Sequence, residues 1–301
     1  MKHIFDKITP GMKPLIVAVV CPVDDNSLRG ASDAAKAQMI IPVLIGSEAK
    51  IRKTADEAGL DISGFEIVPA GNNHAAAWKA AELVRDGHAE ALMKGAISTD
   101  EFLGPVVAKE NRLRTDRRMS HVLIMEDPGY HKPLYVADGA MNPLPTLADK
   151  IDILQNTIDL FRVIEGRAPK VAVLTASEHI DPKQPATLDA AALAVMSTRG
   201  QISGAGFVEG PLSFDIAVSK EAARVKGVKS DVAGDPDIFL FPGMDTANIF
   251  VKSRMQFSGA KIGGVVVGAR VPIILTSRAD GSEQRMSSSA IALLSVRNSR
   301  A

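Results

Sequence analysis

Residues 15–20 read LIVAVV, and residues 40–45 read IIPVLI. Neither segment alternates apolar with polar side chains, as a strand with one solvated face would. Short, continuous apolar runs rich in valine and isoleucine are typical of strands buried on both faces of a parallel sheet. These two runs therefore predict a parallel sheet with helices on both of its faces.

Short apolar runs and longer amphipathic segments continue to alternate along the chain. Further strands are predicted at residues 65–68, 91–93, 121–125, 134–137, 170–175, 238–241, 263–267 and 272–275. Helices are predicted at residues 73–86, 147–164 and 186–199. The first and last of these helices run into Gly87 and Gly200, and glycine commonly ends a helix. Repeated strand–helix units predict doubly wound α/β/α layers.

The composition indicates a folded protein with no affinity for nucleic acid. The 301 residues suggest two domains or one large one. Apolar residues make up 46% of the chain, whereas Lys plus Arg and Asp plus Glu each total 35. A nucleic-acid-binding protein usually shows a strong basic excess. The single cysteine, Cys21, excludes an internal disulfide and a cysteine-based metal site.

The apolar stretches are too short to anchor the chain in a membrane. The longest, residues 262–275, is interrupted by three glycines, Arg270 and Pro272, and a spanning helix needs about 20 apolar residues. The first apolar run is too short for a signal peptide. We therefore expect a soluble, cytoplasmic protein without a membrane partner, and a reducing environment for Cys21.

Common sequence motifs of hydrolases and nucleotide-binding proteins are missing. The six histidines form no HExxH pair, and no GxSxG sequence occurs. Residues 21–26, after the first strand, read CPVDDN and lack the glycines of a dinucleotide-binding turn. GxxxxGK[ST] is also missing. These observations disfavour zinc hydrolases, simple serine hydrolases, Rossmann dehydrogenases and P-loop proteins.

Polar turns follow predicted strands at the edge where open α/β sheets bind ligands. The first reads MKGAIST at residues 93–99. Gly95 permits close approach of the backbone, and Lys94 adds a positive charge. Ser98 or Thr99 suits the cap of a helix, whose free N–H groups also favour an anion. The turn is therefore either a phosphate site or an ordinary helix cap.

The second turn reads TSRAD at residues 276–280. A hydroxyl, a guanidinium and a carboxylate stand close together there, on Ser277, Arg278 and Asp280. Arginine suits bidentate recognition of phosphate or carboxylate. The alternative is a helix cap with a local ion pair, and the density of polar groups favours the functional interpretation.

Two other polar segments carry weaker signals. Residues 245–248 read DTAN after a predicted strand, and capping of a helix by Asp245 explains part of this turn. Residues 109–118 hold five basic side chains against two acidic ones. Such a run attracts phosphorylated molecules but is more often a solvated face. Cys21 is interpreted as a small core residue rather than a nucleophile.

Seven segments together resemble the phosphate acetyl/butyryltransferase family, in collinear order over nearly the whole chain. They are LMKGAIST (92–99), RRMSHVLIM (117–125), VADGAMNPLPTLADKIDI (136–153), PATLDAAALAVMSTRGQISG (185–204), VEGPLSFDIAVS (208–219), VAGDPDIFLFPGMDTANI (232–249) and VPIILTSRAD (271–280). Each segment is moderately specific alone, and all seven in order are a strong signal.

The resemblance implies a reversible reaction of acyl-CoA with inorganic phosphate, giving acyl phosphate and CoA without a metal or prosthetic group. It also implies the fold of the isocitrate/isopropylmalate dehydrogenase group, with two α/β domains flanking a cleft, and a homodimer. The proline-rich turn at residues 138–145 marks the domain boundary. The expected domains are residues 1–142 with 267–301, and residues 143–266.

Family roles carry over to matching positions of this sequence. Ser277 would donate to the thioester carbonyl oxygen, and Arg278 would hold phosphate and stabilise negative charge. Asp280 is the candidate general base. The predicted substrate-binding residues lie in three other segments: Lys94, Gly95, Ser98, Thr99, Asn142, Thr246 and Asn248.

Two departures from the family pattern concern charged groups. Gly104 stands where members commonly have arginine, so the anchor is lost or is supplied by Lys94, Arg114 or Arg117. Acetyl members have an aspartate where this chain has Gln284, which leaves Asp280 or Glu283 as the base.

The leading hypothesis is a phosphate acetyltransferase, and a phosphate butyryltransferase is the alternative. Two further classes remain for comparison. One is a CoA-binding homologue with weakened catalysis, suggested by the missing arginine. The other is an NAD-dependent decarboxylating dehydrogenase of the same fold. It would need a cluster of metal-binding aspartates, and the sequence shows none.

Overall fold

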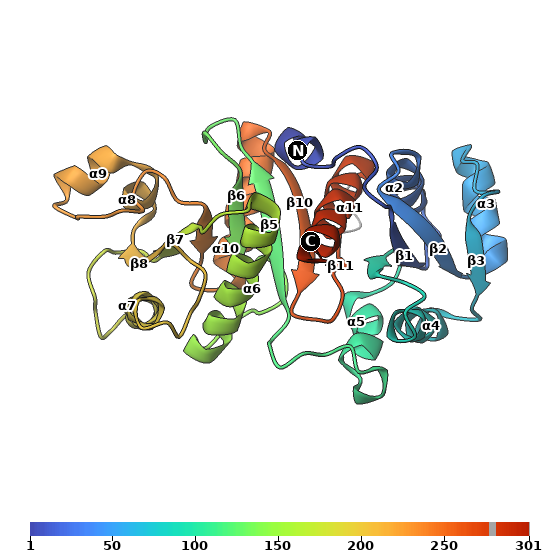
Figure 1. Cartoon of the computed structure of the whole chain (residues 1–301), viewed down its shortest axis with the longest axis horizontal. Coiled ribbons are helices and arrows are strands. Elements are labelled where there is room, and N and C mark those ends of the chain that lie inside the picture. The colour runs from blue at the N-terminus through green and yellow to red at the C-terminus, as the bar shows by residue number, and fades with distance from the viewer. Residues whose placement is uncertain (277–280, 301) are drawn as a thin grey trace. The chain divides into compact units, whose positions relative to one another are not determined.

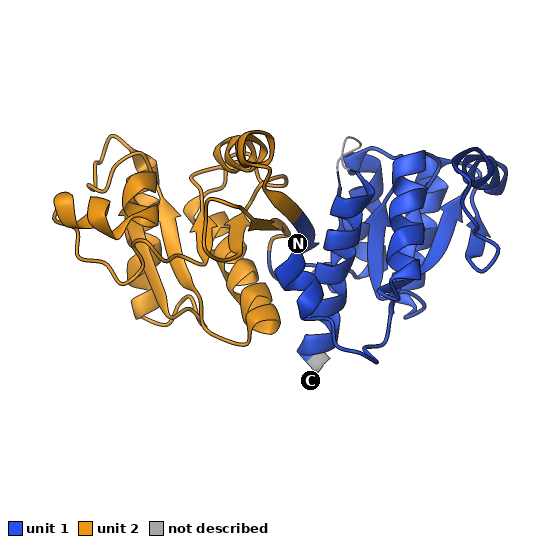
Figure 2. Cartoon of the chain, turned by 90° about the horizontal axis from the view of Figure 1, so that it is seen from above, with its two compact units in different colours: residues 1–117, 263–301 blue, residues 118–262 orange. Residues whose placement is uncertain are grey.

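The computed structural model describes residues 1–276 and 281–300, and the chain forms two compact units (Figure 2). Unit 1 comprises Met1–Arg117 with Gly263–Ala301, and unit 2 comprises Arg118–Ile262. These bounds differ from the expected domains, because the expected boundary after residue 142 falls inside unit 2. Residues 134–137 belong there because they pair with a strand at residues 238–240.

The sheet of unit 1 contains strands from both ends of the chain (Figure 1). They are β1 (Leu15–Val20), β2 (Ile40–Gly46), β3 (Glu66–Pro69), β4 (Ala91–Lys94), β10 (Lys261–Val267) and β11 (Ile273–Ile274). Their order across the sheet is β3-β2-β1-β4-β11-β10. Every neighbouring pair is parallel except β10 and β11.

Helices cover both faces of this sheet. They are α1 (Lys2–Asp6), α2 (Asp25–Lys36), α3 (Glu48–Ala58), α4 (Asn73–Arg85), α5 (Thr99–Val107) and α11 (Ser282–Arg297), with short 3₁₀ turns η1 (Lys109–Asn111) and η2 (Asn298–Arg300). Helices α2 and α11 pack together on one face, whereas α4 and α5 pack together on the other (Figure 1).

The sheet of unit 2 has five strands in the order β5-β6-β9-β7-β8. They are β5 (Ser120–Glu126), β6 (Leu134–Ala137), β7 (Lys170–Leu174), β8 (Phe207–Leu212) and β9 (Ile238–Leu240). Only β5 and β6 pair antiparallel, and the other neighbours are parallel.

The helices of unit 2 are α6 (Leu147–Glu165), α7 (Pro185–Thr198), α8 (Phe214–Val218), α9 (Lys220–Val225) and α10 (Met244–Ser258). Buried side chains of α8, α9 and α10 share one apolar cluster with one face of the sheet. On the other face, Phe161 of α6 packs edge-on against Tyr135 of β6, with ring centroids 4.8 Å apart. The sheet is therefore buried on both faces.

The predicted doubly wound α/β layers are confirmed, and each predicted strand overlaps an observed one. Several features were not predicted, among them helices α2, α3 and α11, for which no ranges were given. Strand β8 was missed because its sequence FVEGPL contains Gly210 and Pro211, which are typical of turns. The two antiparallel pairs, β10 with β11 and β5 with β6, were not predicted either, since apolar runs do not encode strand direction.

Gly95 is required by a close approach of two strand ends. A Cβ atom at this position would lie 2.4 Å from the carbonyl oxygen of Cys21 and 2.5 Å from that of Val20. Backbone hydrogen bonds hold the same approach, because the Gly95 N–H donates to the Val20 oxygen at 2.9 Å. The glycine thus allows β4 to turn directly beside the end of β1.

We expect Gly95→Ala to lower the free energy of unfolding by about 1–3 kcal/mol, as overpacking against rigid backbone does. Gly104→Ala is the matched control, because an added Cβ there meets no atom within 4 Å. Glycine inside a helix is about 1 kcal/mol less favourable than alanine, so this variant should gain stability. Guanidinium denaturation measures both, and equal effects of the two substitutions would contradict the packing argument.

Candidate active site

Strands β4 and β11 bring the turn after Lys94 and the residue Thr276 to one edge of the unit 1 sheet. The strands are parallel, with Leu92 paired to Ile273 and Met93 paired to Ile274. Parallel strands end at the same edge, where open α/β sheets bind ligands. The turn that follows Lys94 and the segment that begins at Thr276 therefore start next to each other.

Arg285 of α11 joins these two strand ends from inside the unit. Its side chain is buried, and its Nη1 donates to the carbonyl oxygen of Lys94 at 2.9 Å and to Oγ1 of Thr276. A buried guanidinium is costly unless it is hydrogen-bonded. The arginine therefore favours the arrangement in which both strand ends stay in place.

Helix α2 leaves room for this arginine at Gly30. A Cβ atom there would lie 2.6 Å from Cδ and 2.8 Å from Cβ of Arg285. The packing of α2 on α11 thus depends on a glycine at the crossing, and the arginine stem fills the space. Neither Arg285 nor Gly30 stood out in the sequence, because their relation exists only when the two helices meet.

The turn after β4 caps a helix, as one of the two interpretations predicted. Ser98 is the N-cap of α5, and its Oγ accepts a hydrogen bond from the Glu101 N–H at 3.2 Å. The Ser98 and Thr99 side chains are exposed, whereas Lys94 and Gly95 are buried. A capping serine still leaves backbone N–H groups at the helix start for an anion. The phosphate-binding role of these residues stays a prediction.

Cys21 lies at the end of β1, directly beside this turn. It is buried, and its Sγ donates to Oδ1 of Asn73 at 3.4 Å. Burial, reinforced by the negative charge of Glu101, raises the pKa of the thiol to about 11. Because the thiolate is the nucleophilic form, Cys21 is a neutral core residue at physiological pH, as expected.

The predicted catalytic residues Ser277, Arg278 and Asp280 lie outside the described residues. The flanking positions are described: Thr276 is buried, and Gly281 is the N-cap of α11. Gln284, at the position of the missing aspartate, lies in the first turn of α11, one residue before Arg285.

A second group of predicted residues meets in unit 2, on the turn after β6. The Asp138 carboxylate accepts hydrogen bonds from the N–H of Ala140 at 3.0 Å and from Nδ2 of Asn142 at 2.5 Å. Nδ2 of Asn248, on α10, donates to the carbonyl oxygen of Gly139 at 3.0 Å. Asn142 and Asn248 are far apart in sequence, but both therefore bind the Asp138–Gly139 part of this turn.

Arg118 completes this network from the basic run. Its Nη1 donates to Oδ1 of Asn142 at 3.2 Å, and its Nε pairs with Asp149 at 2.5 Å. Asp149 also closes the capping box of α6 with Thr146, and both contacts lower the pKa of its carboxyl group. Asp138 and Arg118 were not predicted as site residues. The aspartate between a strand and a glycine was the signal that could have revealed them.

His121 of β5 is a buried histidine beside the same network. The register pairs Val122 with Ala137, so His121 comes opposite Asp138 in the antiparallel ladder. Neither ring nitrogen has a hydrogen-bond partner among the described residues. Burial lowers the pKa of His121, although the negative charge of Asp138 opposes this shift. The ring is therefore neutral at pH 7.

The third turn was only partly understood from the sequence. Helix α10 begins at Met244 with Gly243 as its N-cap, so the expected capping by Asp245 is wrong. The helix starts two residues earlier than that expectation required, and Asp245 lies in its first turn. Thr246 is exposed in that turn, and its predicted role in substrate binding stays a prediction.

Gly104, the position of the missing arginine, lies exposed on α5 with open space around it. Within residues 1–276 and 281–300, no group of three His, Cys, Asp or Glu side chains is arranged to hold a metal ion. No helix of the described chain is long and apolar enough to cross a membrane.

The fold and these turns define an α/β protein that presents glycine, hydroxyl and cationic groups at the carboxyl ends of parallel strands, an arrangement suited to anionic ligands. The family model described as "Phosphate acetyl/butaryl transferase" matches residues 70–293. The chain belongs to this family. It is accordingly a phosphate acyltransferase, and the dehydrogenase hypothesis is set aside.

Individual relatives agree with this assignment. The chain is 46% identical to a phosphate acetyltransferase of Rhizobium meliloti, over 96% of this chain and 91% of the relative. It is 44% identical to a phosphate butyryltransferase of Clostridium acetobutylicum, over 94% and 93%. A branched-chain phosphotransacylase from Enterococcus faecalis V583 superposes with a TM-score of 0.82 at 31% identity, covering 94% of this chain and 99% of that one.

We expect Arg285→Met to reduce kcat/KM about 10²-fold, because misplacement of reacting groups by about 1 Å has an effect of this size. Arg297→Met is the control on the same helix, since Arg297 pairs with Glu90 at the amino end of β4, whereas Arg285 binds at the carboxyl ends. Steady-state CoA release, corrected for the folded fraction by circular dichroism, measures both. Loss of activity only in proportion to unfolding would contradict a positioning role.

We also expect the Cys21 thiol to resist a thiol reagent at pH 8 in the native protein and to react fully after denaturation. As pH rises from 9.0, the ordinary thiol pKa, towards about 11, only the unfolded thiol ionises. Folding stability therefore falls over this range. Cys21→Ala should remove that part of the fall in denaturation curves. An equally steep fall in both proteins would show that the thiol does not cause it.

Proposed function

We propose that this phosphate acyltransferase uses acetyl-CoA, with the reversible reaction acetyl-CoA + phosphate = acetyl phosphate + CoA. Butyryl-CoA is the alternative substrate. The main observation in support of this active site is the parallel pairing of β4 with β11, whose ends are linked by Arg285. This pairing makes Lys94 and Thr276 neighbours, and each of them begins a segment with predicted substrate contacts.

The chemistry defines what the site must supply. A phosphate oxygen attacks the thioester carbonyl carbon, the carbonyl oxygen takes the negative charge, and the carbon–sulfur bond then breaks. CoA leaves as a thiolate and takes up a proton; in reverse, a base removes that proton. Donors for the oxyanion, a cation for phosphate and a proton acceptor are therefore required.

We assign the central roles to the segment after β11. Ser277 donates to the carbonyl oxygen, Arg278 holds phosphate and stabilises the developing charge, and Asp280 accepts the thiol proton. Family membership and the buried anchor of Thr276 on Arg285 support this assignment. The serine hydroxyl is a neutral donor, so the positive charge must come from the arginine.

We assign phosphate and CoA binding to the remaining predicted residues. Lys94, Gly95, Ser98 and Thr99 bind phosphate through the turn before α5. The residues Asn142, Thr246 and Asn248 of unit 2 bind substrate as well. The hydrogen bonds that join Asn142 and Asn248 to the turn after β6 support a shared role for those two.

The reaction is proposed to need no cofactor beyond CoA, which is a substrate. Attack of phosphate on a thioester transfers an acyl group without net oxidation or reduction. The charges involved can be balanced by Arg278 and by backbone N–H groups. Dialysis against a chelator should therefore leave the rate of CoA release unchanged.

The choice of acyl group depends on the size of an apolar pocket. One methylene in such a pocket changes binding by only about 1–3 kcal/mol. The similarity to acetyltransferases and to butyryltransferases differs by two percentage points, 46% against 44%. We favour acetyl because four of the relatives at 45–46% identity carry that name.

The first experiment follows CoA release from acetyl-CoA, butyryl-CoA and isobutyryl-CoA, with and without phosphate. Phosphate-dependent release supports the reaction, and the highest kcat/KM identifies the acyl group. The branched substrate is included because of the phosphotransacylase of similar fold. Binding of CoA without release from any substrate would instead support a homologue with weakened catalysis.

We expect Ser277→Ala to reduce kcat about 10²–10³-fold, as removal of one oxyanion donor does. Arg278→Ala should reduce activity by orders of magnitude and also raise the KM for phosphate. Ser282→Ala, a few residues on in α11, is the control for a lost hydroxyl in the same region. Near-normal turnover of Ser277→Ala and Arg278→Ala would contradict the catalytic roles assigned to these two residues.

We further propose that the protein forms a homodimer. Helix α10 exposes apolar side chains, with Ile249 at 68% and Phe257 at 89% exposure, and exposed apolar patches commonly mark association surfaces. Light scattering after size-exclusion chromatography should give twice the chain mass. A monomer at micromolar concentration would exclude a stable dimer.

A further inference from the structure

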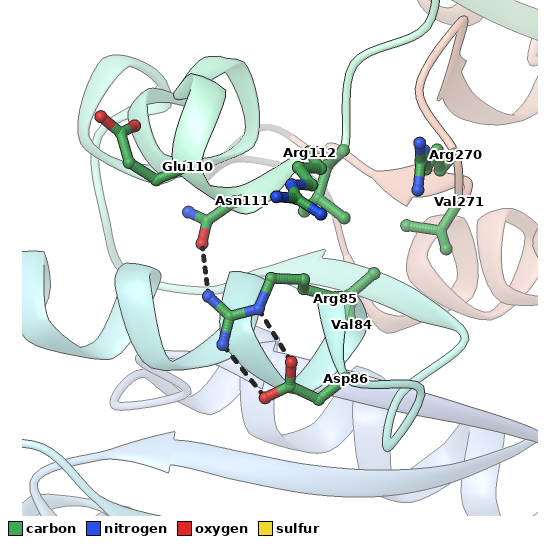
Figure 3. A pocket seen from close by; sticks show the side chains of 9 residues that line it. Val84, Arg85, Asp86, Glu110, Asn111, Arg112, Arg270 and Val271 are labelled. Carbon is green, nitrogen blue, oxygen red and sulfur yellow. Dashed lines mark hydrogen bonds and ion pairs between the residues drawn. The ribbon is translucent and has the colours of Figure 1, made fainter.

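A polar pocket of about 570 Å³ lies at the opposite edge of the unit 1 sheet from the candidate active site (Figure 3). Its walls come from the end of α4, from residues 110–113 after α5, and from Arg270 and Val271. Helix α4 ends before β4 begins, and Arg270 precedes β11. The pocket therefore lies at the amino ends of these strands, whereas the predicted catalytic turns follow their carboxyl ends.

Three arginines line this pocket, and one of them is already neutralised. Nε and Nη2 of Arg85 donate to the two carboxylate oxygens of Asp86 at 2.8 and 3.1 Å. This pairing raises the pKa of Arg85 and lowers the pKa of Asp86. Nη1 of Arg85 also reaches Oδ1 of Asn111 at 3.5 Å. The pair is thus a fixed polar wall rather than a free charge.

Arg112 and Arg270 carry the available positive charge. Neither guanidinium has a hydrogen-bond or ion-pair partner within the described part of the chain. Both side chains are drawn at the pocket in Figure 3, and Glu110 lies beyond Asn111, away from Arg112. Arginine stays protonated at all physiological pH values. Two unpaired guanidinium groups at one concave site favour a ligand with more than one negative charge.

The backbone at Arg112 is unusual for an arginine. Its φ of 53° and ψ of 29° lie in the left-handed region, which glycine adopts without strain and most side chains avoid. A turn of this shape could be made by glycine at no conformational cost. An arginine in its place keeps the turn and adds a charged side chain to the pocket. Such a backbone outlier supports a functional role for the arginine.

Main-chain contacts hold the two arginines near each other. The Arg270 N–H donates to the carbonyl oxygen of Leu113 at 2.9 Å, and Arg114 forms a bridge with Ala269. The segment of Arg112 and the segment of Arg270 are therefore joined as a short antiparallel pair. Both guanidinium groups extend from a backbone that is ordered before any ligand arrives, which lowers the entropic cost of binding.

We propose that this pocket binds a small organic phosphate, with the phosphate groups on Arg112 and Arg270. Arginine matches phosphate geometry with paired N–H donors. The aliphatic side chains of Val84, Leu113 and Val271 also line the pocket, so an organic body contributes apolar contact. The site is separate from the substrate sites proposed above, and it accounts for part of the basic run at residues 109–118.

Titration calorimetry with inorganic pyrophosphate and with ADP tests this site. Pyrophosphate probes recognition of phosphate alone, and tighter binding of ADP would show the contribution of the apolar wall. We expect Arg112→Gly and Arg270→Gln each to weaken binding about tenfold or more, as loss of a charge-assisted hydrogen bond does. Arg112→Gly should fold normally, because glycine accepts the left-handed turn.

Arg199→Gln is the control, because Arg199 is an exposed arginine of unit 2 at the end of α7. It should bind both probes like the unaltered protein. All three variants should retain phosphate-dependent CoA release, which keeps this test separate from the proposed reaction. Unchanged binding in Arg112→Gly and Arg270→Gln would assign the probes to the substrate site and overturn the proposal. No binding of either probe would also overturn it.

Discussion

The buried guanidinium of Arg285 is the interaction on which the candidate active site depends. It connects the carbonyl oxygen of Lys94 with the hydroxyl of Thr276, and thereby links the ends of β4 and β11 to α11. A charge in this position is tolerated only while its hydrogen bonds are kept. The arginine therefore penalises any displacement of either strand end. Gly30 provides the room for its side chain, and Gly95 lets β4 turn beside the end of β1.

The two sheet edges of unit 1 have different chemical characters. At the carboxyl edge, the buried cations Lys94 and Arg285 lie beside Gly95 and Thr276. At the amino edge, Arg112 and Arg270, which have no ion-pair partner among the described residues, line a pocket with the pair Arg85–Asp86. The two-residue strand β11 (Ile273–Ile274) runs between these edges, so a single short segment belongs to both.

Sequence patterns predicted the strands well, only some of the helices, and the relations between elements poorly. Continuous apolar runs such as residues 15–20 predict strands because burial on both faces demands it. Strand β8 was missed because Gly210 and Pro211 obscure its pattern, and the antiparallel pairing of β5 with β6 left no trace in composition. The N-cap of α10 is Gly243 rather than Asp245, and glycine is among the residues accepted at this position.

The sequence by itself determined the α/β class, the positions of the polar turns and, through seven collinear segments, the family. These depend on local periodicity and on residue types at short spacing. Only the tertiary structure decided that Lys94 and Thr276 share Arg285, that Asn142 and Asn248 contact one turn, and that Arg112 shares a pocket with Arg270. Such relations join residues far apart in the chain, and strand order and helix packing create them.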